Sequence, residues 1–269
     1  MGVVNVTPDS FSDGGLFADR AAAVAHAHRL IAEGAAIIDV GGESTRPDAQ
    51  PVSPAVELER VMPVLEDLRS AGVPISVDTS KPEVMRTALA HGADMINDVY
   101  AFRAPAALDV IASSDAAICI MHMQGEPRTM QRAPHYENVV AEVGAFLSER
   151  AAAAERAGVT RDRIVIDPGF GFGKTLEHNL TLLRELQHIA GLGWPVLAGL
   201  SRKSMLGRIT GRDAGERVHA SVAAALLAVL HGARIVRAHD VQATRDALAV
   251  LQAVEASAES SLGNGRSNG

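Results

Sequence analysis

The sequence has a single cysteine, Cys119, among its 269 residues, so an intrachain disulfide is impossible. A chain of this size without disulfides fits a reducing compartment, and we expect the cytoplasm. Cys119 lies in the apolar run AAICIMHM, which predicts a strand whose thiol belongs to the core. No apolar run is long enough to cross a bilayer and no signal peptide is recognisable, so membrane partners are not expected.

Aromatic residues and positive charges are also scarce. Aromatic side chains make up 3% of the chain, and 25 Lys and Arg stand against 32 Asp and Glu, for a net charge of -7. An acidic surface argues against nucleic acid as a partner, but it leaves room for an anionic small molecule where basic side chains converge. The 47% hydrophobic content is mostly Ala, Val, Ile and Leu, which is typical of a parallel sheet covered by helices.

Apolar strand-like runs alternate with amphipathic stretches along the whole chain. Eight repeats of this kind predict a single-domain α/β protein, a closed (β/α)8 TIM barrel, with an open doubly wound sheet as the alternative. We expect the barrel to span residues 1–257 and residues 258–269, rich in Ser, Gly and Asn, to form a disordered tail. The predicted strands are 2–4, 36–40, 74–77, 95–96, 116–120, 164–166, 195–198 and 235–236. The predicted helices are 19–33, 54–71, 82–91, 104–112, 137–157, 177–189, 216–231 and 240–254.

Every predicted strand ends in polar residues. In a barrel the carboxyl ends of the strands form one face, and that face carries the active site. Helix capping explains part of the pattern, because Ser80 and Asp240 stand where the third and last helices begin. Capping does not require the other polar side chains, so we expect a functional site built from the segments NVTPDSFSDGG (5–15), GGESTRP (41–47), DTSK (78–81), INDV (96–99), DPGFGFGK (167–174), GLSRKS (199–204) and RAHD (237–240).

The polar residues divide into two predicted half-sites. Asp78, Asn97 and Asp167 are short acceptors and amides, which suit the edge of a flat heterocycle rich in N–H donors. The second half-site comes from strands 1, 2 and 8, which become neighbours when a barrel closes, and it suits a phosphate or a diphosphate. Asn5 there offers a neutral oxygen ligand for Mg2+, and Lys203 lies between the halves. The other members of the second half-site are Arg46, Arg237 and His239.

Two common motifs are excluded by spacing. GFGFGKT (169–175) lacks the glycine spacing of a phosphate-binding P-loop, and no GxGxxG is present. His122 and His135 do not have the spacing of a metal site, and His122 is expected in the core or at the rim.

With these motifs in order, the chain resembles the dihydropteroate synthase family over about residues 1–254. The resemblance implies a (β/α)8 barrel that forms a homodimer. It also implies a transferase of folate biosynthesis, which is a sulfonamide target. The family joins 6-hydroxymethyl-7,8-dihydropterin diphosphate to 4-aminobenzoate, giving 7,8-dihydropteroate and pyrophosphate.

The resemblance also implies roles for individual residues. Asp78, Asn97, Asp167 and Lys203 would bind the pterin. Asn5, Arg237 and His239 would bind the diphosphate, with Asn5 on Mg2+. Thr45 and Arg46 would contact the diphosphate and enclose aminobenzoate, Ser201 would receive its carboxylate, and Phe172 would pack near its amine. Asp9 and Phe11 would fold over the site, and Lys203, Asp9 and Arg46 are the catalytic candidates.

The implied chemistry depends on positioning and on leaving-group stabilisation. Pyrophosphate leaves readily once Mg2+ and basic side chains neutralise its charge, and the weak aromatic amine demands no strong base.

Other functions are also compatible with parts of the sequence. A pterin-binding methyltransferase would share Asp78, Asn97 and Asp167 but would not need Arg46, Lys203, Arg237 and His239. A non-catalytic pterin-binding homologue and a generic phosphate-binding barrel are the remaining alternatives.

Overall fold

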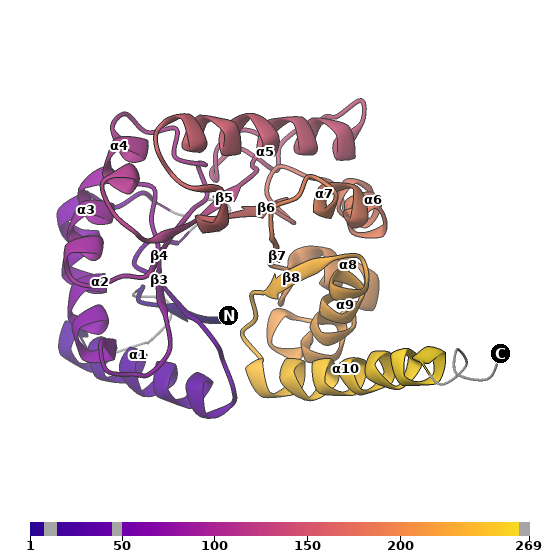
Figure 1. The fold of residues 1–269 in the computed structure, drawn as a ribbon. Helices are drawn as coiled ribbons and strands as arrows, with labels where there is room; N and C mark the ends of the chain where they lie inside the picture. The colour runs from indigo at the N-terminus through magenta and orange to yellow at the C-terminus, as the bar shows by residue number, and fades with distance from the viewer. Residues whose placement is uncertain (8–14, 45–49, 264–269) are drawn as a thin grey trace.

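The computed structural model describes the backbone of residues 1–7, 15–44 and 50–263. Eight parallel strands follow one another around a sheet in chain order, and the helices lie outside it (Figure 1). A parallel bridge between Gly2 and Ala238 joins the end of the last strand to the first. The fold is therefore the expected TIM barrel. The strands are β1 (Gly2–Asn5), β2 (Ile38–Gly41), β3 (Ile75–Asp78), β4 (Met95–Asp98), β5 (Ala117–Met121), β6 (Ile164–Asp167), β7 (Val196–Ala198) and β8 (Ala233–Val236).

Three of the covering helices, α2 (Pro54–Leu68), α3 (Pro82–Ala90) and α5 (Val139–Arg156), begin with recognisable start signals. Ser53 and Asn138 accept hydrogen bonds from the backbone of α2 and α5, and Pro54 and Pro82 occupy the first positions of α2 and α3. The helices are α1 (Gly15–Ala32), α2 (Pro54–Leu68), α3 (Pro82–Ala90), α4 (Ala107–Ala112), α5 (Val139–Arg156), α6 (Leu176–Arg184), α7 (Leu186–Ala190), α8 (Ser204–Thr210), α9 (Val218–Leu230) and α10 (Val241–Gly263). The later part of α10 projects beyond the other helices in the view of Figure 1.

The two faces of each strand have different neighbours. Outward-facing Val and Ile side chains such as Val40, Val77 and Ile118 pack with the helices in the main core. The opposite faces point into the barrel, where a small apolar cluster contains Met95, Cys119, Val165 and Leu197. Cys119 is fully buried and unpaired, as expected. Because successive side chains alternate between faces, the residues two positions further along reach the barrel mouth.

The helices depart from the sequence predictions most clearly in three places. The stretch 177–189 is two helices, because the backbone of Glu185 leaves the helical region at φ -106° and ψ 19°. Helix α8 was not among the predicted ranges, since its seven residues are too few to show a helical period. Helix α10 continues to Gly263, past the predicted end at 254 and into the expected tail, whose last residues, 264–269, lie outside the described part.

The predicted cap at Ser80 is wrong. The N-cap of α3 is Lys81, because Pro82 fixes the first helical position one residue later than expected. Asp240 does precede α10, but its carboxylate binds Arg202, at 2.6 Å to Nη2 and 3.0 Å to Nε.

Candidate active site

The sheet register brings the predicted acceptors into one row. Asn5 pairs with Gly41, Gly41 with Asp78, and Asp78 with Asn97, so these residues lie at one level on neighbouring strands. A Cβ on Gly41 would lie 3.5 Å from Cβ of Asp78 and 3.8 Å from Oδ1 of Asn5. Glycine at this position therefore leaves space between the asparagine and the aspartate at the barrel mouth.

Arg237 joins the two predicted half-sites. Its Nε donates to Asp39 Oδ2 at 2.7 Å, and its Nη2 donates to Asp78 Oδ2 at 3.1 Å. Burial lowers the pKa of Arg237, but the fields of Asp39 and Asp78 outweigh burial and raise the pKa above its usual value. The predicted diphosphate residue is thus ion-paired to a predicted pterin residue.

Asp39 is a site residue that the sequence analysis missed. It lies on β2, is fully buried, and also accepts a long hydrogen bond of 3.4 Å from Asn97 Nδ2. Its Oδ1 has no hydrogen-bond partner among the described residues. A signal was available, because an aspartate inside an apolar strand needs a charged partner, and Asp39 shares the inward face with Gly41.

The acidic groups sit in a strongly desolvated environment. Burial, and secondarily the charge of Asp39, raises the pKa of Asp78 to about 8. Burial also raises the pKa of Asp167, against a hydrogen bond of 2.7 Å that Gly169 N donates to its Oδ1. Both carboxylates therefore gain from a ligand that brings N–H donors.

Asp78 should make the folded protein lose stability as pH rises. Its folded-state pKa of about 8 exceeds the ordinary value of 3.8, so the folded chain holds this proton more tightly than the unfolded chain. The resulting stabilisation is complete below about pH 4 and is lost as pH rises towards 8. Asp78→Asn removes this titration. The melting temperature of the variant minus that of wild type should therefore be about 2–5 °C higher at pH 8 than at pH 5.

Calorimetry at the two pH values checks this expectation. Asp109→Asn, which removes a carboxylate from an exposed position, is the matched control. A variant Asp78→Asn that loses more stability at pH 8 than at pH 5 would show that Asp78 is ionised in the folded protein.

Lys203 and Phe172 meet at the mouth. Lys203 Nζ lies 4.0 Å from the centroid of the Phe172 ring. Burial lowers the pKa of Lys203 to about 8, against the nearby charge of Asp167. Gly171 has φ +81°, and a Cβ there would lie 3.1 Å from Lys203 Cδ. Phe172 also packs against a second apolar cluster, which contains Val99, Met121, Met123 and Met130.

His239 and Ser201 form a pair. The hydroxyl of Ser201 accepts from His239 N at 3.1 Å and lies 3.0 Å from His239 Nδ1. The hydroxyl proton is then available to Nδ1, which assigns the ring proton to Nε2. Burial, followed by the charges of Arg237 and Arg202, lowers the pKa of His239 to about 4. The imidazole is therefore a neutral donor near pH 7.

The stem of the second loop is held by an ion cluster. Lys81 Nζ contacts both Glu43 and Glu57, and Glu57 is fully buried. The predicted residues Thr45 and Arg46 of this loop, and Asp9 and Phe11 of the first loop, lie outside the described residues.

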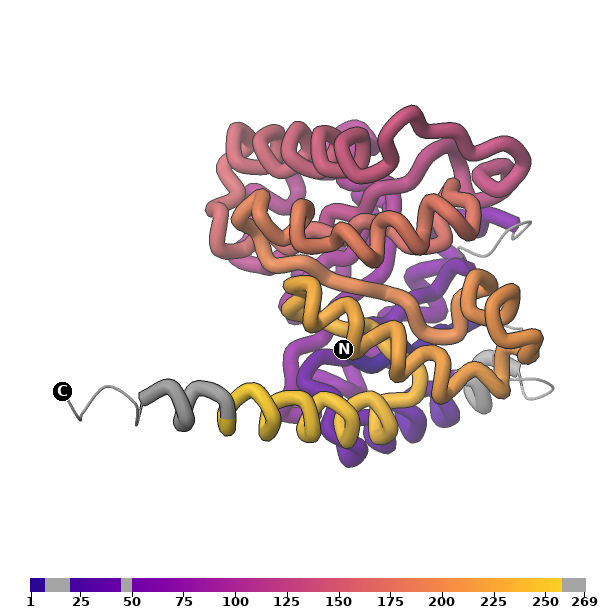
Figure 2. The backbone as a smooth tube through the Cα atoms, turned by 90° about the vertical axis from the view of Figure 1, so that its right-hand side faces the viewer, coloured from indigo at the N-terminus to yellow at the C-terminus, as the bar shows by residue number. Residues whose placement is uncertain are grey.

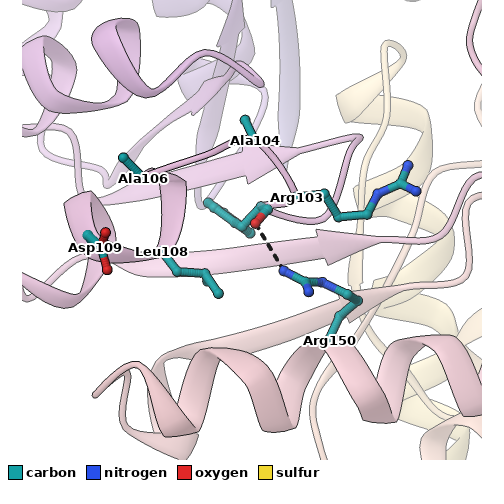
Figure 3. A pocket seen from close by; sticks show the side chains of 7 residues that line it. Arg103, Ala104, Ala106, Leu108, Asp109 and Arg150 are labelled. Carbon is teal, nitrogen blue, oxygen red and sulfur yellow. Dashed lines mark hydrogen bonds between the residues drawn. The ribbon is translucent and has the colours of Figure 1, made fainter.

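Two cavities lie beside the mouth. One of about 540 Å³ includes His239, Arg202 and Asp240 in its lining. The other, of about 400 Å³, lies between the segment that follows β4 and helix α5, and includes Arg103 and Arg150 (Figure 3). Arg150 donates there to Phe102 O at 2.9 Å. None of the predicted site residues lines this second cavity, so its lining forms no part of the predicted site.

The comparisons with known proteins identify the family of this chain. A model of the pterin binding enzyme family matches residues 1–239. Dihydropteroate synthase from Neisseria meningitidis serogroup C is 54% identical over 259 residues, covering 94% of this chain and 92% of that protein.

Solved structures show the same similarity. Dihydropteroate synthase from Xanthomonas albilineans with 4-aminobenzoic acid has a TM-score of 0.90 and 56% identity, over 95% of this chain and 92% of that chain. The Yersinia pestis enzyme in a sulfonamide drug complex has a TM-score of 0.90 and 42% identity, over 95% of this chain and 93% of that chain. Because the family model matches residues 1–239 and a relative 54% identical is matched over 94% of the chain, this chain belongs to the pterin-binding enzyme family.

Proposed function

We propose that this protein is a dihydropteroate synthase. It condenses 6-hydroxymethyl-7,8-dihydropterin diphosphate with 4-aminobenzoate and releases 7,8-dihydropteroate and pyrophosphate. The observation that carries the proposal is the bracing of Arg237 by Asp39 and Asp78, which places a cation beside buried acceptors at one barrel mouth. A pterin with a diphosphate leaving group needs both kinds of group within one site.

The acceptors suit the pterin edge. Asp167 and Asn97 are buried and Asp78 is nearly so, and ring N–H groups would provide the donors that these side chains can accept. Asn97 Oδ1 has no partner among the described residues, so a ligand donor would satisfy it. Lys203 interacts electrostatically with Asp167, and its ammonium can donate to a pterin carbonyl or ring nitrogen.

The cations suit the leaving group. Among the described residues the carboxylates occupy Nε and Nη2 of Arg237 and leave Nη1 for a ligand, and His239 offers Nε2–H. These donors stabilise the charge that develops on pyrophosphate as the carbon–oxygen bond breaks. The anilinium formed when the amine attacks is acidic enough to lose its proton to water, so the protein needs no strong base.

Mg2+ fits the donors at the mouth. Among the described residues no group of three or more His, Cys, Asp or Glu could hold a metal ion. Mg2+ commonly uses one or two protein oxygens together with phosphate oxygens and water, so Asn5 Oδ1 beside the side-chain-free Gly41 is a sufficient protein contribution. When bound, the ion neutralises diphosphate charge.

Aminobenzoate would enter on the side of Lys203 and Phe172. We assign its ring to the Phe172 side and its carboxylate to the Ser201 segment. Thr45, Arg46 and Asp9 remain proposed contacts from the first two loops.

We propose a homodimer in the cytoplasm. Leu227 and Leu230 on α9 and Val250 and Val254 on α10 are 46–66% exposed, and α9 lies against α10 (Figure 2). A second copy that covers these side chains would explain why α9 is apolar around its circumference. The cytoplasm fits the unpaired Cys119. None of the described helices is long and apolar enough to cross a membrane.

Sulfonamide competition tests the proposed function. A sulfonamide carries an aromatic amine and an anionic group in place of aminobenzoate, so it should raise the apparent KM for aminobenzoate without changing kcat. Initial rates at several fixed drug concentrations measure this. A pattern competitive with the pterin diphosphate instead would place aminobenzoate in a different part of the site.

A further inference from the structure

The loop between β6 and α6 is built on three glycines with unusual backbone angles. Gly169, Gly171 and Gly173 have φ values of +67°, +81° and +60°. A Cβ on Gly169 would lie 1.9 Å from His122 O, and one on Gly173 would lie 2.3 Å from Gln124 O. The loop therefore packs directly on the backbone that follows β5, without regular strand or helix hydrogen bonds of its own.

Lys174 holds this loop from inside. Its ammonium donates to Gly169 O at 2.9 Å, to Phe172 O at 3.0 Å, and to His122 Nδ1 at 2.9 Å. These contacts use all three N–H groups of the ammonium, and the residue is 3% exposed. Burial lowers the pKa of Lys174 to about 7, against the charge of Asp167. Burying an ammonium costs free energy, and the three acceptors around Lys174 offset that cost.

His122 is fixed as the third acceptor. Its ring makes an edge contact with Phe146 at 4.9 Å and a tilted contact with Tyr136 at 6.0 Å between centroids. Burial, followed by the charge of Lys174, lowers the pKa of His122 to about 3, so the ring stays neutral and can accept. Tyr136 in turn donates to Gly173 O at 2.9 Å, which ties the same loop a second time.

Phe172 connects the β6–α6 loop to the candidate active site. Lys174 binds the backbone oxygen of Phe172, and the ring of Phe172 lies under the ammonium of Lys203. We propose that Lys174 is a positioning residue that fixes the β6–α6 loop so that Phe172 supports Lys203 beside aminobenzoate. The expected effect on aminobenzoate binding rests on the proposed function. The expected effect on the positions of Phe172 and Lys203 does not.

The chain offers a clean spectroscopic test, because it contains only three lysines, Lys81, Lys174 and Lys203. Protein carrying 13C at the lysine ε-carbons should give three signals, assigned by single substitutions. The Lys203 signal should be displaced upfield by the Phe172 ring. In Lys174→Met this displacement should be lost, and KM for aminobenzoate should rise about tenfold or more while KM for the pterin diphosphate changes less.

Lys81→Met is the matched control. It also removes a part-buried ammonium, at the N-cap of α3, but Lys81 contacts Glu43 and Glu57 rather than the β6–α6 loop. The Lys203 signal should stay displaced in this variant. A folded Lys174→Met protein with an unchanged Lys203 signal and unchanged KM for aminobenzoate would overturn the proposal.

Two further outcomes keep the test decisive. If Lys174→Met does not fold, the pH titration of the Lys174 signal in the wild-type protein takes its place. A Lys174 that titrates near pH 10, as an exposed lysine does, would overturn the buried position on which the proposal depends. If the wild-type protein makes no dihydropteroate, the proposed function fails, and the loss or retention of the Lys203 displacement still tests the positioning role.

Discussion

Replacing Arg237 with methionine should reduce the affinity for the pterin diphosphate by about 10²- to 10³-fold. The loss has two sources. The diphosphate loses a cationic donor, and Asp39 and Asp78 lose the guanidinium that now lies 2.7 and 3.1 Å from their oxygens. Removing the guanidinium leaves the buried Asp39 carboxylate without its ion-pair partner, so the variant should also lose about 3 kcal/mol of stability.

The same variant separates the two halves of the site. Free pterin should also bind less well, because Asp78 is no longer braced, but its loss should be smaller than that of the diphosphate. Calorimetric titration with both ligands measures the difference. Arg202→Met is the matched control, because Arg202 pairs with Asp240 at the same face and does not contact Asp39 or Asp78. Equal losses for the two ligands would contradict a diphosphate role for Arg237.

Replacing Lys203 with alanine should lower kcat/KM by about 10²- to 10³-fold and leave the melting temperature within a few degrees of wild type. Lys203 is half-buried at the mouth, and its ammonium faces the Phe172 ring rather than a direct ion-pair partner. Burial already disfavours its charged form. The folded protein therefore has little to lose from its removal, whereas a bound substrate would lose a donor.

A pH profile gives this prediction a second readout. The pKa of Lys203 is about 8, so the charged form, and with it kcat/KM, should decline as pH rises through that value. In Lys203→Arg the part of this decline that Lys203 causes should disappear, because a guanidinium stays charged, whereas any part due to the titration of Asp78 should remain. If Lys203→Ala instead unfolds at a much lower temperature than wild type, Lys203 has a structural role and the prediction is wrong.

Much of the fold could be predicted because it depends on local patterns. The strands are short apolar runs, and polar residues stand at or just after many of their ends, as Asn5 and Asp78 do, so the barrel and its mouth follow from the order of the segments. The break at Glu185 could not be predicted, since the apolar period of α6 continues into α7. Helix α8 is too short to show a period at all.

The interior of the site could be predicted only in part. The strand-end residues were found, but the sequence gives no indication that Arg237 pairs with Asp39, which lies 198 residues away. Nor does it show that Lys174, whose motif resembles a phosphate-binding loop, turns inward to its own loop carbonyls. Such pairings depend on how the barrel closes, and local spacing does not encode them.

The most direct test of the central claim is pyrophosphate release. The purified protein would be supplied with dihydropterin diphosphate and Mg2+, with and without 4-aminobenzoate. We predict release that depends on aminobenzoate and is accompanied by an equal amount of dihydropteroate. Tight pterin binding with no release under any condition would contradict the synthase and favour a methyltransferase or a non-catalytic pterin binder.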